Sequence, residues 1–134
     1  MLGCEYQILD RKKPNHPPGN QDTGALYGLY APDPLRVLNP AGQFNLSRII
    51  VRGDEVEHWL NGKRIVLATV GSADWETRIA KSKFNDVPEF ARQRAGRIML
   101  TDHGAEVWYR NLKIRMPLPA NDKKADPEQK ANRD

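Results

Sequence analysis

The sequence predicts an all-β protein, an antiparallel β-sandwich built from six or seven short strands. Short β-rich segments recur along the chain, turn residues separate them, and little of the sequence has a helical pattern. Strands that follow one another through tight turns pair in antiparallel order and need a second layer to bury their apolar faces. No internal repeat of about 20–50 residues is present, so a solenoid or a propeller is not expected.

The first predicted strand spans residues 3–9 (GCEYQIL). Glu5 and Gln7 lie on one face of this strand, and Tyr6 and Ile8 lie on the other, because successive side chains of a strand point to opposite sides. We expect Tyr6 and Ile8 to fill the core. Glu5 and Gln7 would then lie on the outer surface.

The clearest pattern is a β-meander in the middle of the chain. Further strands are predicted at residues 25–30, 44–51, 56–60 and 63–67, with a turn at Gly53-Asp54. Asn61-Gly62 separates the last two of these strands. This dipeptide tolerates positive φ at both positions, which a type I′ turn requires. We therefore predict a two-residue type I′ hairpin at this point.

The C-terminal part contains a weak helical or irregular stretch at residues 72–84 and two more predicted strands, at residues 97–103 and 106–115. Gly104 forms the turn between these strands. Residues 117–134 carry almost no apolar side chain, and such a segment cannot offset its ordering entropy by burial. We expect one β-sandwich domain over residues 1–116 and a disordered polar tail over residues 117–134.

Composition limits the possible functions. The formal net charge is +4 and the sequence pI is about 9.3, but basic and acidic residues are interspersed, whereas nucleic-acid binding needs a concentrated basic face. No stretch approaches the roughly 18–20 apolar residues of a membrane span, and residues 1–10 lack the pattern of a signal peptide. The single cysteine, Cys4, cannot form an internal disulfide. We expect neither a nucleic-acid partner nor a membrane span.

Six short motifs follow one another along residues 3–115. They are GCEYQILD at 3–10, GALY at 24–27, FNLSR at 44–48, VEHWLNG at 56–62, IAKSKF at 79–84, and DHG at 102–104 continuing to RNLKIR at 110–115. In this order they resemble the 3-keto-disaccharide hydrolase family. The resemblance implies a concanavalin A-like jelly roll of two curved antiparallel sheets. Family domains carry further strands before the first motif, so it also implies an N-terminally truncated fold.

The resemblance further implies a carbohydrate partner, namely a glycoside whose C3 hydroxyl is oxidised to a ketone. A C3 ketone acidifies the hydrogen on C2, and the glycosidic oxygen on C1 is β to the resulting carbanion. Cleavage can therefore proceed by C2 proton abstraction and β-elimination, followed by hydration. Such a site needs a base, an acid for the leaving oxygen, and donors for the enolate oxygen. Family members are commonly exported.

Glu5 and His58 are the expected proton-transfer pair. Glu5 lies within the Glu-Tyr-Gln motif, and His58 has an ordinary pKa near about 6.5, which suits proton transfer at neutral pH. His58 also shares a strand face with Val56 and Leu60, so a packed, hydrogen-bonded histidine is an equally good interpretation. Gln7, beside Glu5, is an expected substrate-binding residue.

Three further side chains are expected to bind substrate: Arg48, Lys81 and His103. Arg48 lies on the strand face opposite Ile49, and His103 lies at a predicted strand end. Lys81 is chosen from the Ala-Lys-Ser-Lys-Phe motif, in which Lys83 is the other candidate. Several aromatic residues could stack on sugar rings but are also typical of β-sheet cores: Tyr27, Tyr30, Trp59, Trp75 and Trp108.

No cofactor is firmly indicated. A divalent metal held by Glu5, His58 and His103 is conceivable, since mixed histidine and carboxylate ligands suit such ions, but no two of them have a diagnostic spacing. Two alternatives to an enzyme stay open. One is a non-catalytic carbohydrate-binding module on the same fold, and the other is an inactive truncated fragment.

Overall fold

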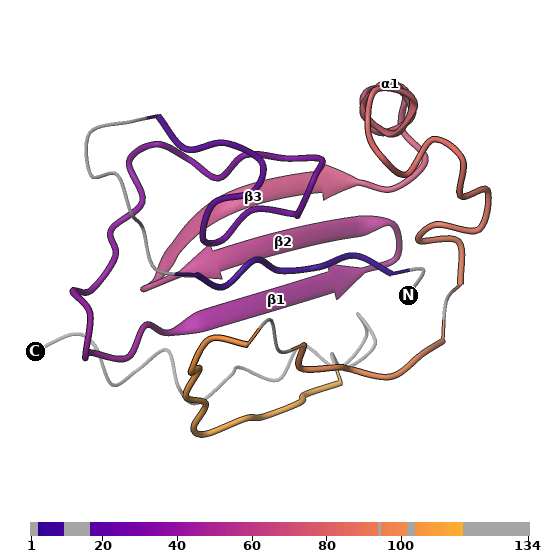
Figure 1. The fold of residues 1–134 in the computed structure, drawn as a ribbon. Coiled ribbons are helices and arrows are strands. Elements are labelled where there is room, and N and C mark those ends of the chain that lie inside the picture. The colour runs from indigo at the N-terminus through magenta and orange to yellow at the C-terminus, as the bar shows by residue number, and fades with distance from the viewer. Residues whose placement is uncertain (1–2, 10–16, 94, 102–103, 117–134) are drawn as a thin grey trace, which may run out of the picture. The chain divides into compact units, whose positions relative to one another are not determined.

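The computed structural model describes residues 3–9, 17–93, 95–101 and 104–116 (Figure 1). Its regular elements are strands β1 (Ser47–Arg52), β2 (Glu55–Leu60) and β3 (Lys63–Thr69) and one helix, α1 (Ala73–Ala80). The chain divides into two compact units, Met1–Arg97 and Ile98–Asp134, and all four elements belong to the first. The fold is therefore an antiparallel sheet with one helix.

The three strands form an antiparallel meander in the order β1-β2-β3 (Figure 1). Two residues connect β2 to β3, and both have positive φ: 47° at Asn61 and 84° at Gly62. These are the signs that a type I′ turn requires, so the predicted hairpin is confirmed. Gly53, with a φ of 59°, turns the chain between β1 and β2.

A β-bulge interrupts the pairing of β2 with β3. His58 pairs with Val66 and Trp59 with Arg64, so Ile65 is the extra residue. The Ile65 side chain is buried against Gly24, where a Cβ atom would clash with it. Gly24 therefore lets the segment before residue 25 lie directly on the sheet.

The core lies on one face of the sheet, the face to which β2 contributes Val56. Segment 25–30, helix α1 and Phe90 cover this face. The buried residues that form the cluster are Leu26, Leu29, Tyr30, Val56, Val66, Ala68, Trp75 and Phe90. Trp75, the buried residue of α1, stacks between the rings of Tyr30 and Phe90.

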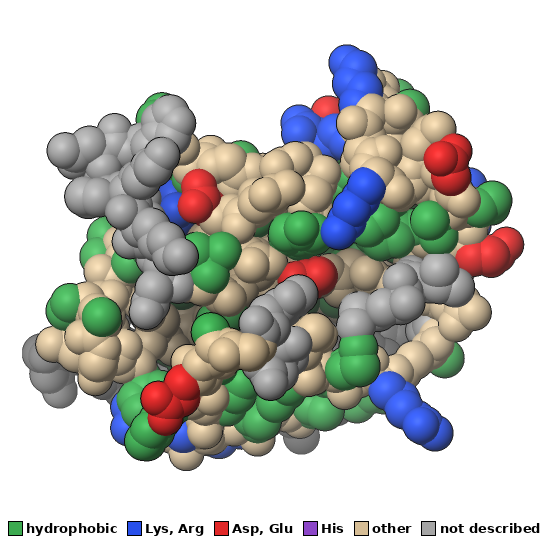
Figure 2. Space-filling view, in the orientation of Figure 1, with side chains coloured by type: hydrophobic (Ala, Val, Ile, Leu, Met, Phe, Trp, Pro, Cys, Tyr) green, Lys and Arg blue, Asp and Glu red, His purple; other side chains and the backbone are tan. Residues whose placement is uncertain are grey.

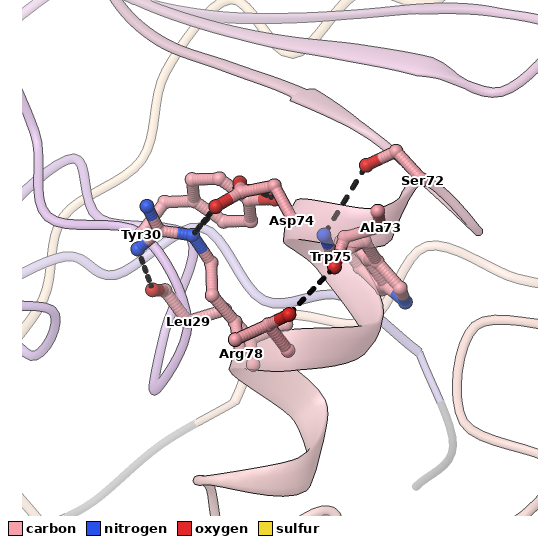
Figure 3. Close-up of polar contacts among 8 residues, drawn as sticks. Leu29, Tyr30, Ser72, Ala73, Asp74, Trp75 and Arg78 are labelled. Carbon is pink, nitrogen blue, oxygen red and sulfur yellow. Dashed lines mark hydrogen bonds and ion pairs between the residues drawn. The ribbon is translucent and has the colours of Figure 1, made fainter.

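Helix α1 lies within the stretch for which a weak helical pattern was predicted. Ser72 caps its N-terminus, because the Ser72 Oγ accepts a hydrogen bond of 3.2 Å from the Trp75 N–H (Figure 3). The described residues contain no helix with the length and apolar character needed to cross a membrane.

A polar clamp ties α1 to the turn at residues 26–30 (Figure 3). Asp74 accepts hydrogen bonds of 2.8 Å from the Tyr30 hydroxyl and 2.9 Å from Arg78 Nε. Arg78 also donates to the Leu29 carbonyl at 3.1 Å, and its guanidinium lies 4.2 Å from the centre of the Tyr30 ring. The helix therefore cannot shift without breaking several bonds to this turn.

The predicted strands at residues 3–9 and 25–30 are wrong as regular strands. Only isolated bridges form, from Tyr6 to Leu26 and from Leu26 to Tyr30. Gly28, with a φ of 76°, turns the chain back, so that the amide of Tyr30 bonds to the Leu26 carbonyl. Residues 26–30 therefore form a closed turn and not a strand. In the first segment Ile8, which was expected in the core, is 45% exposed.

The predicted strands at residues 97–103 and 106–115 are also absent from the described residues of the second unit. Gly104 has the positive φ, 80°, expected of a turn. A strand needs a hydrogen-bonded partner and a covered apolar face. Ile98, Trp108 and Ile114 instead remain more than two-thirds exposed, at 75%, 71% and 79%. The predicted tail at residues 117–134 lies outside the described residues.

Candidate functional site

His58 lies at the centre of the sheet and is only 1% exposed. Its Nδ1 is 3.0 Å from the Gly24 carbonyl, and because a carbonyl only accepts, Nδ1 carries the proton. Burial lowers the pKa of His58 below 6.5, and backbone hydrogen bonds to Gly24 and Ala25 oppose this shift. His58 is therefore neutral at pH 7, and the geometry favours the packed histidine over the base among the two interpretations of the sequence.

Tyr6 covers His58. The two ring centroids are 4.6 Å apart, and the Tyr6 hydroxyl donates to the Trp59 carbonyl at 3.2 Å. Burial is the main cause of the raised pKa of Tyr6. Since Tyr6 faces the sheet, its neighbours Glu5 and Gln7 project away from the sheet. No hydrogen bond or ion pair joins Glu5 to His58 within the described residues.

Segment 5–7 lies antiparallel to segment 24–27. The Tyr27 amide donates to the Glu5 carbonyl at 3.0 Å, the Gln7 amide to the Ala25 carbonyl at 3.1 Å, and the Gly24 amide to the Gln7 carbonyl at 2.8 Å. The bridge between Tyr6 and Leu26 places Glu5 directly opposite Tyr27.

Lys83 completes this group from a different part of the chain. Its Nζ lies 4.4 Å from the centre of the Tyr27 ring. The Lys83 ammonium and the Tyr27 ring are thus neighbours, and Glu5 is joined to Tyr27 through the backbone; we call these three residues the Glu5–Tyr27–Lys83 surface. On the face drawn in Figure 2, acidic and basic side chains lie among hydrophobic ones. Glu5 and Tyr27 are half-buried, and Lys83 is exposed.

The chain after α1 fixes the position of Lys83. The Ser82 hydroxyl donates to the Ile79 carbonyl at 2.9 Å and accepts from the Phe84 amide at 3.0 Å. The Phe84 ring stacks on Phe90, with centroids 4.1 Å apart. Gly28 makes room for this ring, since a Cβ there would lie 2.9 Å from Phe84 Cε2. Lys83 is therefore held between two anchored neighbours.

Lys81, the lysine chosen from the sequence, has a different position. It is the exposed C-cap residue of α1, and its backbone N–H bonds to the Arg78 and Ile79 carbonyls. The structure brings Lys83, and not Lys81, to Tyr27. The motif alone does not distinguish Lys81 from Lys83. Lys83 directly precedes an apolar residue, Phe84, and this feature of the sequence could have indicated that Lys83 lies closer to the folded part of the chain.

Gln7 lies beside Glu5 and is half-buried. Its Oε1 is buried and makes no hydrogen bond with any described residue. Gln7 and Glu5 are expected to share one face of this extended segment, because side chains alternate along it.

Arg48 is not brought to this surface. It pairs with Trp59 in the β1–β2 register, whereas Ile49 pairs with His58. Since side chains alternate, Arg48 projects from the face of the sheet opposite His58. There it lines a small hollow of about 80 Å³ together with Leu46, Trp59 and Gly62.

His103 lies outside the described residues, so the metal site conceived from Glu5, His58 and His103 is not described as a whole. No three His, Cys, Asp or Glu side chains within the described ranges lie close enough together to hold a metal ion. An open depression of about 430 Å³ lies beside β3, where Pro17, Pro18, Pro32 and Pro34 form part of its wall. Tyr30, one of the aromatic residues considered for sugar stacking, also lines it, but none of the described residues predicted to be catalytic or to bind substrate does.

Comparison with known proteins identifies the family. The model of the 3-keto-alpha-glucoside-1,2-lyase-like domain matches residues 1–115. The chain belongs to this family. The resemblance drawn from the motifs is thereby confirmed.

Two relatives extend this result. The chain is similar to a 3-keto-disaccharide hydrolase of Bacteroides thetaiotaomicron, with 27% identity over 128 residues that cover 84% of this chain and 43% of the relative. It is also similar to a crystal structure from Parabacteroides distasonis described as a "putative glycosyl hydrolase", with a TM-score of 0.50 and 34% identity. That match covers 55% of this chain and 32% of the other. The chain thus spans less than half the length of either relative.

Proposed function

We propose that this chain takes part in the cleavage of 3-keto-glycosides, with the Glu5–Tyr27–Lys83 surface as the place where the sugar is bound and deprotonated. The observation that carries the proposal is the position of Lys83 Nζ, 4.4 Å from the centre of the Tyr27 ring, across from Glu5. Family membership over residues 1–115 and the names of the two relatives support a glycoside as substrate.

The proposed reaction has two steps. In the first, Glu5 takes the proton from C2, and the C2–H electron pair forms an enolate with its charge on the C3 oxygen. The enolate electrons then form the C1=C2 double bond, and the C1–O bond breaks with its electrons on the leaving oxygen, which takes a proton from water. Water then adds across the double bond, with hydroxide on C1 and a proton on C2. The sum is hydrolysis, and no paired carboxylates around an acetal are required.

Each side chain has a definite part in this scheme. The Lys83 ammonium stabilises negative charge on the enolate oxygen, because donors aimed at developing charge lower the barrier. The Tyr27 ring packs against the C–H face of the sugar, and Gln7 hydrogen-bonds a hydroxyl. His58, the second member of the pair predicted from the sequence, is buried beneath Tyr6, so we propose that it acts by positioning Tyr6 and Gly24.

We also propose that residues 1–116 form part of a jelly-roll sandwich, with residues 117–134 as a polar tail. Ile49 and Val51 share the core-side face of β1 and are 53% and 55% exposed. A second sheet packed on this face would cover both side chains, which is how sandwiches bury their inner residues.

The test compares three variants in the release of the leaving sugar from a 3-keto-disaccharide. Glu5→Gln removes the base and should lower kcat by about 100-fold or more, the usual contribution of a general base. Lys83→Met keeps the length of the side chain but removes the charge, and should lower kcat by about tenfold or more. Lys81→Met is the matched control and should keep the wild-type rate.

Three outcomes would count against the proposal. They are full activity of the Glu5→Gln variant, an equal loss in the Lys81→Met control, and equal rates on the 3-keto-disaccharide and the parent disaccharide. Binding of the sugar without any release by the unaltered chain would instead indicate the carbohydrate-binding module.

A further inference from the structure

The sheet face opposite His58 carries a row of side chains that the proposed reaction does not use. Trp59 on β2 pairs with Arg48 on β1 and with Arg64 on β3. Paired residues of neighbouring strands project side by side on one face, about 4.5–5.5 Å apart at Cβ. An indole thus lies between two guanidinium groups, and we call these three side chains the Arg48–Trp59–Arg64 row.

A buried carboxylate fixes the orientation of the indole. Trp59 Nε1 donates a hydrogen bond of 2.7 Å to Glu57 Oε2, and Glu57 is only 5% exposed. The Tyr6 hydroxyl bonds to the Trp59 carbonyl from the other face. The ring is half-buried, so part of its surface stays accessible beside Arg48 in the small hollow. Trp59 is therefore a rigid aromatic platform.

The charges on this face are not fully balanced. Arg52 is paired, with its Nη1 at 2.9 Å from Glu57 Oε1, and Glu55 lies opposite Arg52 at the same end of the face. Arg64 Nη1 is 3.8 Å from Glu57 Oε2, which already accepts from Trp59, and the Arg64 side chain is 50% exposed.

The positive charge of Arg48 lies at the other end of the row. It is exposed, and its side chain makes no hydrogen bond or ion pair with any residue in the ranges that the structure describes. The Arg48 guanidinium is therefore available to bind an anion beside Trp59, and Arg64, whose contact with Glu57 is long, adds positive charge on the other side of the ring. An extended phosphate backbone would need a longer basic surface without Glu55 and Glu57.

We infer that the Arg48–Trp59–Arg64 row binds a sugar that carries a carboxylate, such as a uronate residue of a glycan. The Trp59 ring packs against the apolar C–H face of the pyranose, and a guanidinium fork binds the planar carboxylate through two parallel hydrogen bonds. This inference goes beyond the proposed reaction, because none of the three residues belongs to the Glu5–Tyr27–Lys83 surface and no bond of the sugar is broken here.

The probe is methyl β-glucuronide, titrated into the full chain and followed by tryptophan fluorescence and by NMR shifts. Methyl β-glucoside has the same ring without the carboxylate, and acetate has a carboxylate without the ring. The glucuronide is expected to bind about tenfold or more tightly than the glucoside, since charge-assisted hydrogen bonds are the strong ones. Acetate at the same concentration should not displace it, and added salt should weaken its binding.

The Arg48→Gln variant should reduce glucuronide affinity to about that of the glucoside, and Arg64→Gln, which removes a guanidinium already in contact with Glu57, should reduce it less. Arg97→Gln is the matched control at another exposed arginine and should bind as the unaltered chain does. Far-UV circular dichroism checks that each variant keeps its fold.

Equal affinity for glucuronide and glucoside would overturn the inference, as would displacement by acetate, which would indicate a general anion site. Loss of binding in Arg97→Gln, or no loss in Arg48→Gln and Arg64→Gln, would also overturn it. Because the readout is binding, these results do not depend on whether the chain cleaves 3-keto-glycosides.

Discussion

Glu57 and His58 are consecutive residues of β2. Both have buried titratable side chains, which are stabilised in two different ways. Glu57 lies on one face, where Arg52, Trp59 and Arg64 surround its carboxylate. His58 lies on the other face, where it donates to a backbone carbonyl and carries no partner charge among the described residues. A buried charge must be paired, whereas a histidine can avoid the cost by staying neutral. One strand thus presents a charged face and an uncharged face.

The lowered pKa of His58 predicts how stability depends on pH. The unfolded chain takes up a proton near pH 6.5, and the folded chain does so only at lower pH. The unfolded state therefore binds more protons in this window, and the stability contributed by neutral His58 is complete above pH 6.5 and falls as the pH drops through and below that value.

Urea unfolding at pH 7 and pH 5 measures this effect. The unaltered chain should be less stable at pH 5, and His58→Gln, which keeps a donor for Gly24 but does not titrate, should show a smaller difference. The same pH dependence in both chains would show that His58 does not titrate with a lowered pKa.

At the scale of elements, the features that could be predicted from the sequence are those that interactions between nearby residues determine. The Asn61-Gly62 turn and the strands beside it were predictable, because turn chemistry and alternation act over a few residues. The turn at residues 25–30 was not predictable. It places Gly28 against the ring of Phe84, which lies far along the sequence. The motif could not indicate that Lys83 lies at Tyr27, since the hydrogen bonds of Ser82 place this part of the chain.

The hairpin turn offers a direct test at this scale. Gly62→Val places a β-branched side chain at a φ of 84° and should lower the free energy of unfolding by more than about 1 kcal/mol. Gly96→Val is the control, because Gly96 has no positive φ and a Cβ there meets no atom within 4 Å. Equal unfolding midpoints of the two variants in urea would contradict the type I′ assignment.

At the scale of the whole molecule, the described residues expose many large apolar side chains. On β1 they include Ile49 and Val51, and in the second unit they include Ile98, Trp108 and Ile114. The chain also spans 43% of the length of the Bacteroides relative. The sandwich predicted from the sequence depends on pairings between distant strands, and such pairings leave no local signal from which the partner can be identified. The meander was therefore predictable from local signals, whereas the second layer of the sandwich stays a prediction.

The central claim is that the glycosidic bond breaks by elimination after Glu5 removes the C2 proton. The most direct measurement is cleavage of a 3-keto-disaccharide in D₂O, with the product examined by NMR at early times. Elimination followed by hydration should place deuterium on C2 of every keto-sugar released, faster than the exchange of the free keto-sugar measured alone, and Glu5→Gln should abolish both release and incorporation. Release of a keto-sugar that still carries its original hydrogen on C2 would contradict the account.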